Sequence, residues 1–193
     1  AQNVLGWAAG EIGYTRWDDP EEGSKYGRWY AQKHGAYYGT SGVPFCAMGA
    51  SWCATDEEKN SVLPGGDFAY VPYGINAAAR EGQLVSPMTQ AAPGDLVCFD
   101  WDDDGIADHV GIVEANYGSW LQTIEFNTSS GVAGSQSNGG GVWRRTRDWS
   151  AVCAVIRPHY GGATTAEGYT DITALQAAVG AATDNVIGPD TTK

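Results

Sequence analysis

Cys46 combines a reactive side chain with a position that would activate it. It lies near the beginning of a helix predicted over residues 44–55, where Pro44 suits the first helical position because proline has no N–H to leave unpaired. The free N–H groups and the positive end of the helix dipole there lower a thiol pKa and favour the thiolate. Cys46 is therefore a candidate nucleophile, although the helix alone fits an inert buried thiol equally well. Several small residues would let this helix pack closely against a sheet, namely Ala47, Gly49, Ala50 and Ser51.

A cysteine nucleophile needs a base within hydrogen-bond reach and a third group that orients the base. The chain has three histidines, and His109 opens a predicted strand that would hold its imidazole rigidly at a sheet end. His34 lies in a polar, tyrosine-rich segment and His159 follows the last predicted strand, so neither has comparable support. His109 is therefore the candidate base.

The predicted strand 121–127 supplies a carboxylate. Because strand side chains alternate, Ile124 and Phe126 should face one side, while Glu125 and Asn127 share the other. An acid and an amide would then face the same space. Alternatively, Glu125 is an exposed strand carboxylate.

If this strand pairs with residues 109–114, Glu125 can accept the N–H of His109 and fix its tautomer, which leaves the other nitrogen for Cys46. Asn127 would help to orient this network or complete it. The catalytic interpretation is favoured because the three parts occur together.

The segment from Asp100 to Asp108 has the spacing of the first half of an EF-hand-type loop. The bidentate glutamate of position 12 is absent, since Gly111 stands there, so a lower affinity is expected. We expect this loop to bind calcium and the activity to fall on chelation. The alternative is an acidic hairpin tip that binds no ion. The predicted ligands are the carboxylates of Asp100, Asp102, Asp104 and Asp108 and the carbonyl of Ile106.

The elements that must position these residues change in type along the chain. Helices are predicted over residues 3–14, with Asn3 as its cap, around 26–32, over 44–55, and in a segment ending near Gly82. Five short β-rich runs follow, at 94–99, 109–114, 121–127, 141–146 and 152–157. Helices followed by an antiparallel sheet predict an α+β fold with the helices on one sheet face.

Composition limits the classes of function. The 193 residues suffice for one good core, and a formal net charge of −12 disfavours nucleic acid and anionic lipid as partners. The three clustered arginines at 144, 145 and 147 are interpreted as a solvated strand edge. No apolar run could span a membrane, the first residues do not form a signal peptide, and a monomer is expected.

The four cysteines form no C-x-x-C pair, which argues against structural zinc. Disulfides are not needed at this size. Cys53, Cys98 and Cys153 are interpreted as buried thiols.

The order of these motifs resembles the CHAP domain (cysteine, histidine-dependent amidohydrolase/peptidase) of bacterial and phage cell-wall lysins. The resemblance rests on the cysteine at a helix start, the Gly94-Asp-Leu strand, Asp-His109-Val-Gly-Ile-Val and Ile-Glu125-Phe-Asn, and it runs from about residue 3 to residue 160. The family's usual Trp-Cys is Phe45-Cys46 here, and its usual Glu-Gly-Asn is Glu-Phe-Asn. Neither departure touches the nucleophile, base or carboxylate.

The resemblance implies a papain-like α+β fold and hydrolysis of an amide bond in bacterial peptidoglycan. It implies that Cys46 attacks, that His109 acts as base and then acid, and that Glu125 orients His109. It also implies an endolysin-type, antimicrobial activity at the cell wall or outside the cell, reached by export or by phage-type lysis. An N-acetylmuramoyl-L-alanine amidase and a peptide endopeptidase would share this machinery.

The chain divides into a predicted catalytic domain over 1–160, a linker over 161–169 and a third segment over 170–193. The last segment is similar to the opening of small helical peptidoglycan-binding modules, with Leu175-Gln and Gly188-Pro-Asp-Thr, and it is interpreted as a truncated module. Two other functions remain open. One is a non-catalytic module that binds calcium or cell wall, and the other is a cysteine protease or transglutaminase-like enzyme that acts on proteins.

Overall fold

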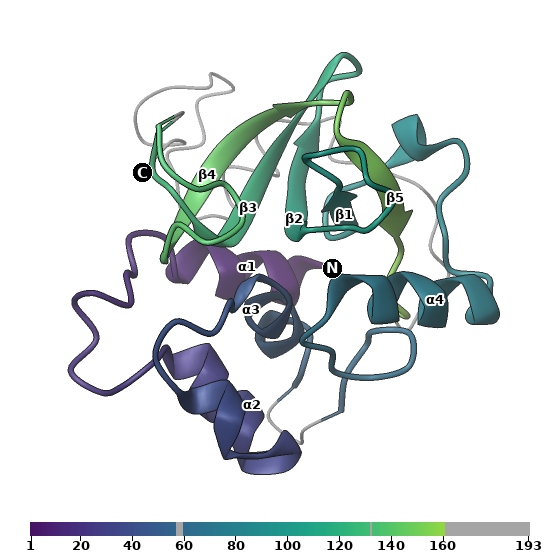
Figure 1. Ribbon diagram of the computed structural model, residues 1–193. Coiled ribbons are helices and arrows are strands. Elements are labelled where there is room, and N and C mark those ends of the chain that lie inside the picture. The colour runs from purple at the N-terminus through teal and green to yellow at the C-terminus, as the bar shows by residue number, and fades with distance from the viewer. Residues whose placement is uncertain (57–59, 132, 161–193) are drawn as a thin grey trace.

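The computed structural model describes residues 1–56, 60–131 and 133–160, and these residues form helices and an antiparallel sheet, as predicted (Figure 1). The predicted linker and the segment 170–193 lie outside the described residues. In chain order the elements are α1 (Gln2–Gly10), α2 (Lys25–His34), η1 (Ala36–Gly39), α3 (Cys46–Cys53), α4 (Val71–Glu81), η2 (Met88–Gln90), β1 (Leu96–Phe99), β2 (His109–Asn116), β3 (Trp120–Thr128), β4 (Gly141–Asp148) and β5 (Val152–Ile156).

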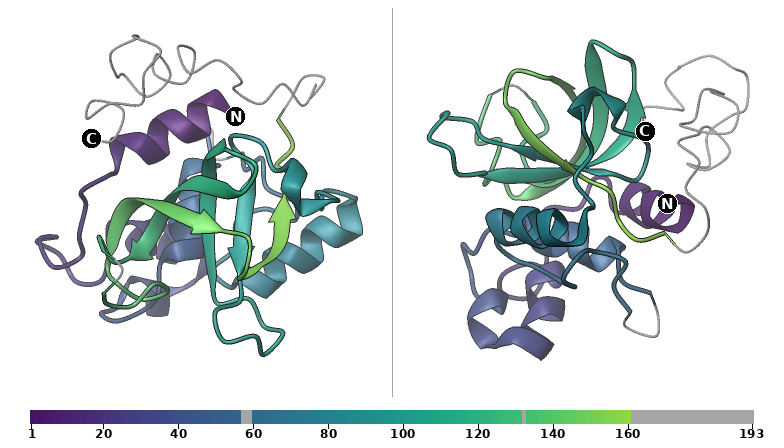
Figure 2. Two further views of the ribbon diagram at one scale, coloured as in Figure 1. Left: turned by 90° about the horizontal axis from the view of Figure 1, so that it is seen from above. Right: turned by 90° about the vertical axis from the view of Figure 1, so that its right-hand side faces the viewer.

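The five strands found in the described residues form one antiparallel sheet in the order β4-β3-β2-β1-β5. Strands β1 to β4 follow one another across the sheet, and β5 returns to pair with β1. The α-helices lie together on one side of the curved sheet (Figure 2). This is an α+β arrangement consistent with a papain-like fold, and all five predicted strands are present.

Helix α3 lies at the centre of the helical layer, in contact with α1, α2, β2 and β3. Every residue of this helix except Trp52 is buried. Its small side chains permit the close approach, because a Cβ on Gly49 would lie 2.3 Å from the Phe126 ring on β3. The predicted close packing of this helix on the sheet is therefore confirmed.

Two helix starts differ from the prediction. Helix α1 begins at Gln2, so Asn3 lies inside the helix and provides no cap. Phe45 is the residue that precedes the first turn of α3, and its φ of −122° and ψ of 17° place Pro44 outside the helix. Pro44 therefore shapes the entry into the helix rather than its first turn. Helix α4 ends as predicted, at a left-handed Gly82.

Apolar side chains cover both faces of the sheet. The larger cluster lies between sheet and helices and includes Ile112, Ile124 and Phe126. The smaller cluster covers the other face and includes Phe99, with Trp101 packed against it. This explains why β1 and β5 are apolar along their whole length.

Two of the three cysteines interpreted as buried thiols are buried, namely Cys53 and Cys98. Cys153 is exposed, so the prediction was wrong there. It lies on β5 at the edge of the sheet, where its side chain faces away from the core while Val152 and Ala154 face inward. Within the described residues there is no helix of the length and apolarity that a membrane span requires.

Candidate active site

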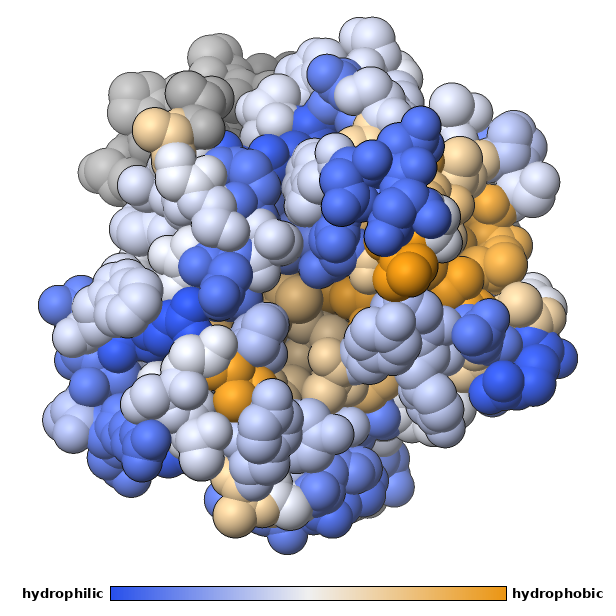
Figure 3. Space-filling model, viewed as in Figure 1, coloured by the Kyte–Doolittle hydropathy of each residue, from blue (hydrophilic) through white to orange (hydrophobic). Residues whose placement is uncertain are grey.

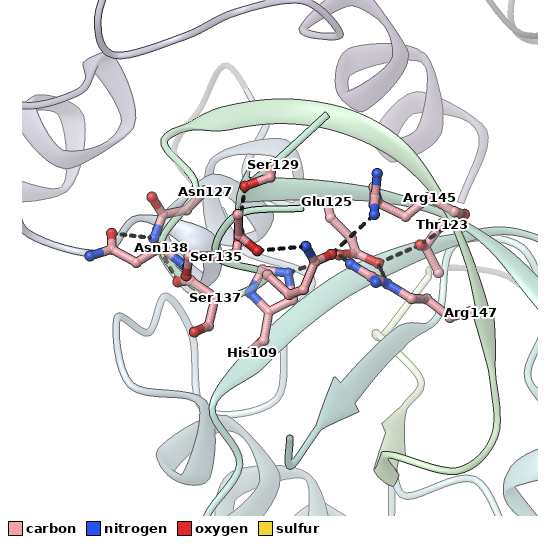
Figure 4. Close-up of polar contacts among 12 residues, drawn as sticks. His109, Thr123, Glu125, Asn127, Ser129, Ser135, Ser137, Asn138, Arg145 and Arg147 are labelled. Atoms are coloured by element: carbon pink, nitrogen blue, oxygen red, sulfur yellow. Dashed lines mark hydrogen bonds and ion pairs between the residues drawn. The ribbon is translucent and has the colours of Figure 1, made fainter. Parts of the chain in front are cut away.

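His109 and Glu125 meet across the pairing of β2 and β3. Gly111 lies directly opposite Glu125 in the register, so His109, two residues earlier on the same face, is a diagonal neighbour of Glu125. The imidazole Nε2 lies 3.0 Å from Glu125 Oε2, and both side chains are completely buried. Figure 4 shows the carboxylate directed at the imidazole ring. The structure thus brings together two of the predicted site residues.

Gly111 makes room for this contact. A Cβ at this position would lie only 2.8 Å from Glu125 Cγ. Any larger residue would push the carboxylate away from His109. The glycine in His-Val-Gly is therefore needed for the position of Glu125.

Cys46 lies in the first turn of α3 with 5% of its surface exposed, and it is close enough to His109 to raise the pKa of the imidazole. Since Nε2 of His109 is bound to Glu125, the nitrogen available for the thiol is Nδ1. That atom is buried and has no hydrogen-bond partner among the described residues. Cysteine, imidazole and carboxylate therefore lie in a row, with Nδ1 left for the thiol.

The neighbours of His109 favour its charged form. Burial lowers the pKa of His109, but interactions with Cys46 and Glu125 outweigh burial, and the pKa rises to about 9. The imidazole in this environment holds a proton at neutral pH. A protonated ring can give its proton to a leaving group.

Glu125 is a carboxylate with all of its acceptor sites in use. Besides His109, it accepts hydrogen bonds from Thr123 Oγ1 at 2.7 Å and from Arg147 at 2.8 and 2.6 Å. Burial raises the pKa of Glu125, but the bonds from Arg147 and His109 lower it to about 2. Glu125 is therefore a fixed anion that accepts hydrogen bonds and neither takes up nor supplies a proton.

The arginine cluster on β4 is not a solvated strand edge. Arg144 pairs with the buried Glu114, and Arg147 pairs with the buried Glu125. Each arginine side chain is only 11% exposed. The partners are 30 and 22 residues away in the chain, so charge counting along the sequence had no signal that could find them.

Asn127 does not share the environment of Glu125. The β3–β4 register shifts between Glu125 and Thr128, and Asn127 has a left-handed φ of 61°. Its amide donates to Ser137 O at 2.9 Å and to Asn138 Oδ1 at 3.2 Å. No hydrogen bond among the described residues joins it to His109 or Glu125, and Figure 4 shows it directed at Asn138. The irregularity explains why strand alternation failed here.

The predicted calcium loop connects β1 to β2 and ends at the residue before His109. Carboxylate oxygens of Asp100, Asp102 and Asp108 lie within 4.8 Å of one another. Asp104 is not part of this group, since its Oδ1 accepts the N–H of Ile106 at 2.8 Å. The charge of Asp104, slight burial and the charges of Asp108 and Asp100 raise the pKa of Asp102.

Several aromatic residues lie in separate places on the molecule. Trp17 and Tyr37 are strongly exposed. Tyr38 lines a hollow of about 310 Å³ together with Tyr70 and Tyr73, which sequence reasoning had not singled out. Trp120 stacks on Tyr117 at the β2–β3 turn, at the opposite end of β2 from His109, so it lies far from the site.

The two other histidines have structural partners. His34 stacks on Tyr30 with ring centroids 4.0 Å apart, and His159 Nε2 lies 2.7 Å from Glu81 Oε2. Figure 3 shows a hollow near the middle of the face on which α3 meets the sheet, with apolar residues at its floor and polar residues around it.

Comparison with known families assigns a class to this arrangement. Residues 37–127, a little under half of the chain, match the model of the CHAP domain. The matched segment holds Cys46, His109 and Glu125, and the match implies a hydrolase of the amidase or peptidase type that acts on peptidoglycan. No curated protein and no solved structure gave a match to the chain.

Proposed function

We propose that this protein hydrolyses an amide bond of bacterial peptidoglycan through a Cys46 nucleophile, with His109 as acid and base and Glu125 as the residue that orients His109. The observation that supports this most strongly is the row of thiol, imidazole and carboxylate at the start of α3 and β2. It lies within the segment that matches the CHAP domain. The bond is either N-acetylmuramoyl-L-alanine or a peptide bond of the stem or cross-bridge.

In the first step the Cys46 thiolate attacks the amide carbonyl, and the carbonyl oxygen becomes an oxyanion. The N–H groups of the first turn of α3 have no partner within the helix and can donate to this oxygen. His109 then gives its proton to the leaving nitrogen as the C–N bond breaks. An amine departs, and a thioester links the acyl group to Cys46.

In the second step water attacks the thioester. His109, now neutral, accepts a proton from the water and keeps it while the sulfur departs as a thiolate, which restores the ion pair. The carboxylic acid that forms loses its remaining proton to solvent. Glu125 keeps the proton on Nε2 and the ring in one orientation throughout. The acyl group leaves as a carboxylate.

The deciding experiment digests purified sacculi with the wild type and with Cys46→Ala and identifies the released fragments by mass spectrometry. We expect fragments with new amino and carboxyl ends from the wild type only, and the masses will identify the bond. Cys46→Ala should still sediment with sacculi, because the substitution removes the nucleophile and leaves the surface intact.

The same two proteins separate the other candidate functions. A module that only binds cell wall would act equally well with either residue at position 46. A protease acting on proteins would cleave casein and leave sacculi intact. Either result would refute the proposed activity.

We also propose that the β1–β2 loop binds calcium through Asp100, Asp102 and Asp108, with the Ile106 carbonyl as a further ligand. The loop is held in shape by its own bonds, since Asp100 accepts the N–H of Gly105 at 2.9 Å and Asp108 accepts that of Trp101 at 2.8 Å. Three carboxylates so close together repel one another, and a divalent cation relieves this repulsion. A bound cation would supply charge and rigidity next to His109.

Terbium luminescence tests this cation site directly, because Trp101 lies within the loop and can transfer excitation to a bound lanthanide. We expect a signal that calcium displaces and that Asp102→Asn weakens. Activity should fall with EDTA and return with calcium. Luminescence that is unchanged in Asp102→Asn, or full activity after thorough chelation, would contradict the proposal.

A further inference from the structure

We propose that Arg147 is a positioning residue of the active site, which holds Glu125 in the one orientation that lets it hold His109. The inference rests on the proposed function and adds a residue to it. No hydrogen bond among the described residues joins Arg147 to the thiol or to the imidazole, so it acts through Glu125.

The contact between Arg147 and Glu125 fixes an orientation as well as a charge. Nε donates to Oε1 at 2.8 Å and a terminal nitrogen donates to Oε2 at 2.6 Å, so the planar guanidinium faces the planar carboxylate. Two parallel bonds prevent the carboxylate from rotating about its last bond. The oxygen bound to His109 is thereby kept in the direction of the imidazole.

Arg147 is itself held from its other side. Its guanidinium lies 4.9 Å from the centre of the Trp101 ring, and that ring stacks on Phe99 at 4.7 Å with an angle of 6° between the planes. The Trp101 ring also lies 6.2 Å from the His109 ring. The indole therefore lies beside both Arg147 and His109.

Removal of the guanidinium would leave Glu125 with bonds from Thr123 and His109 alone. Thr123 binds the oxygen that does not contact His109, so it cannot prevent rotation about the bond to the carboxyl carbon. A carboxylate that is buried without its cation is strongly destabilised, so the Glu125 side chain would move to find another partner. The imidazole would lose its fixed direction toward Cys46, although each catalytic group would still be present.

The chain provides a matched control on the same strand. Arg144 makes the same kind of buried, two-pronged ion pair, from Nε and a terminal nitrogen to Glu114 at 2.8 to 3.0 Å, with the same exposed fraction as Arg147. Glu114 is bound to Gln122 and lies outside the row of catalytic groups. Loss of either ion pair should cost similar stability, whereas only one loss should affect turnover.

The test compares Arg147→Met, Arg147→Lys and Arg144→Met at a temperature at which all are folded by circular dichroism. We expect Arg147→Met to lower kcat on sacculi by about ten- to a hundredfold, with the apparent KM nearly unchanged, because a misplaced catalytic group affects the reaction more than binding. Arg147→Lys should recover part of the rate, since it keeps the charge but not the two-pronged geometry. Arg144→Met should keep the wild-type kcat.

A second measurement does not depend on the substrate. The rate at which iodoacetamide alkylates Cys46, followed by mass spectrometry of its peptide, should fall in Arg147→Met and stay constant in Arg144→Met. If both methionine variants lose kcat and reactivity equally, or if neither does, Arg147 has only a structural role and the inference is wrong. If Arg147→Met does not fold, Arg147→Lys decides by the same comparison. Failure of the wild type to digest sacculi would refute the proposed function, whereas the alkylation rates would still test Arg147.

Discussion

Glu125 is the single residue on which most of the site's geometry depends. It accepts hydrogen bonds from His109, Thr123 and Arg147, and Gly111 on the neighbouring strand leaves the space that it occupies. A carboxylate with all of its acceptors in use cannot turn toward solvent or take up a proton readily. The orientation of His109 therefore depends, through Glu125, on Thr123, Arg147 and Gly111.

Gly111→Ala should impair catalysis without touching any catalytic group. Its Cβ would lie 2.8 Å from Glu125 Cγ, so the carboxylate must shift away from His109. We expect turnover on sacculi to fall by about a hundredfold, the effect of displacing a catalytic group by about 1 Å. Gly6→Ala is the control, since a Cβ at Gly6 meets no atom within 4 Å. Equal turnover in the two variants would contradict this account of Gly111.

The pH dependence of turnover should follow His109. Because its pKa is raised to about 9, the imidazole keeps the proton that the leaving amine needs up to that pH. We expect kcat/KM to decline above about pH 9, while alkylation of Cys46, which needs only the thiolate, does not decline. If kcat/KM and the alkylation rate decline together, the loss of activity above pH 9 is due to unfolding and not to His109.

The same shift affects stability with a defined sign. A histidine whose pKa is raised on folding stabilises the fold fully below its unfolded pKa of about 6.5, and this contribution is lost as pH rises through about 9. The unfolding midpoint should therefore fall over that range in the wild type, and it should fall less in His109→Ala.

At the scale of elements, the contact between α3 and β3 places the nucleophile. Helix α3 can bring Cys46 up to the start of β2 only because its residues facing the sheet are small. The Phe126 ring occupies the space that a side chain at Gly49 would need. From the sequence, Phe126 stands where CHAP domains usually have glycine. The space for its larger side chain comes from Gly49 on the helix.

Gly49→Ala should destabilise the protein, because its methyl group would lie 2.3 Å from the Phe126 ring in the core. Overpacking of this kind costs about 1–3 kcal/mol. Thermal unfolding followed by circular dichroism measures the loss. The double variant Gly49→Ala, Phe126→Leu should recover part of it, and no recovery would mean that the ring is not the cause.

Contacts near Tyr160 fasten the last described residues to the turn before β1. Tyr160 donates to the carbonyl of Gly94 at 2.6 Å, and Arg157 pairs with Asp95 at 2.7 Å. The catalytic unit over 1–160 stays a prediction.

A chain that ends at Tyr160 should therefore fold by itself. We expect one cooperative thermal transition at nearly the midpoint of the full chain and the same rate of Cys46 alkylation. A chain that ends at Ile156 is the matched control, since it lacks both Arg157 and Tyr160, and its midpoint should be lower. A low or broad transition for the longer chain would show that residues beyond 160 belong to the same folding unit.

The sequence by itself determined where the α-helices and strands lie, although not the residues at which α1 and α3 begin. Apolar periodicity and turn residues predicted α4, α3 and the five strands, because these signals depend on neighbours within a few positions. They also placed Cys46 at the start of a helix and His109 at the start of a strand, as the structure has them. The pairing of His109 with Glu125 needed only one further assumption, that β2 and β3 are adjacent.

Only the tertiary structure decided which partners these residues have. Arg147 binds Glu125 because β4 pairs with β3 in one particular register, and Asn127 turns away because that register shifts beside it. Cys153 is exposed because β5 is an edge strand. Contacts of this kind depend on strand order and on irregularities that bring distant residues together, and neither leaves a periodic trace in the chain.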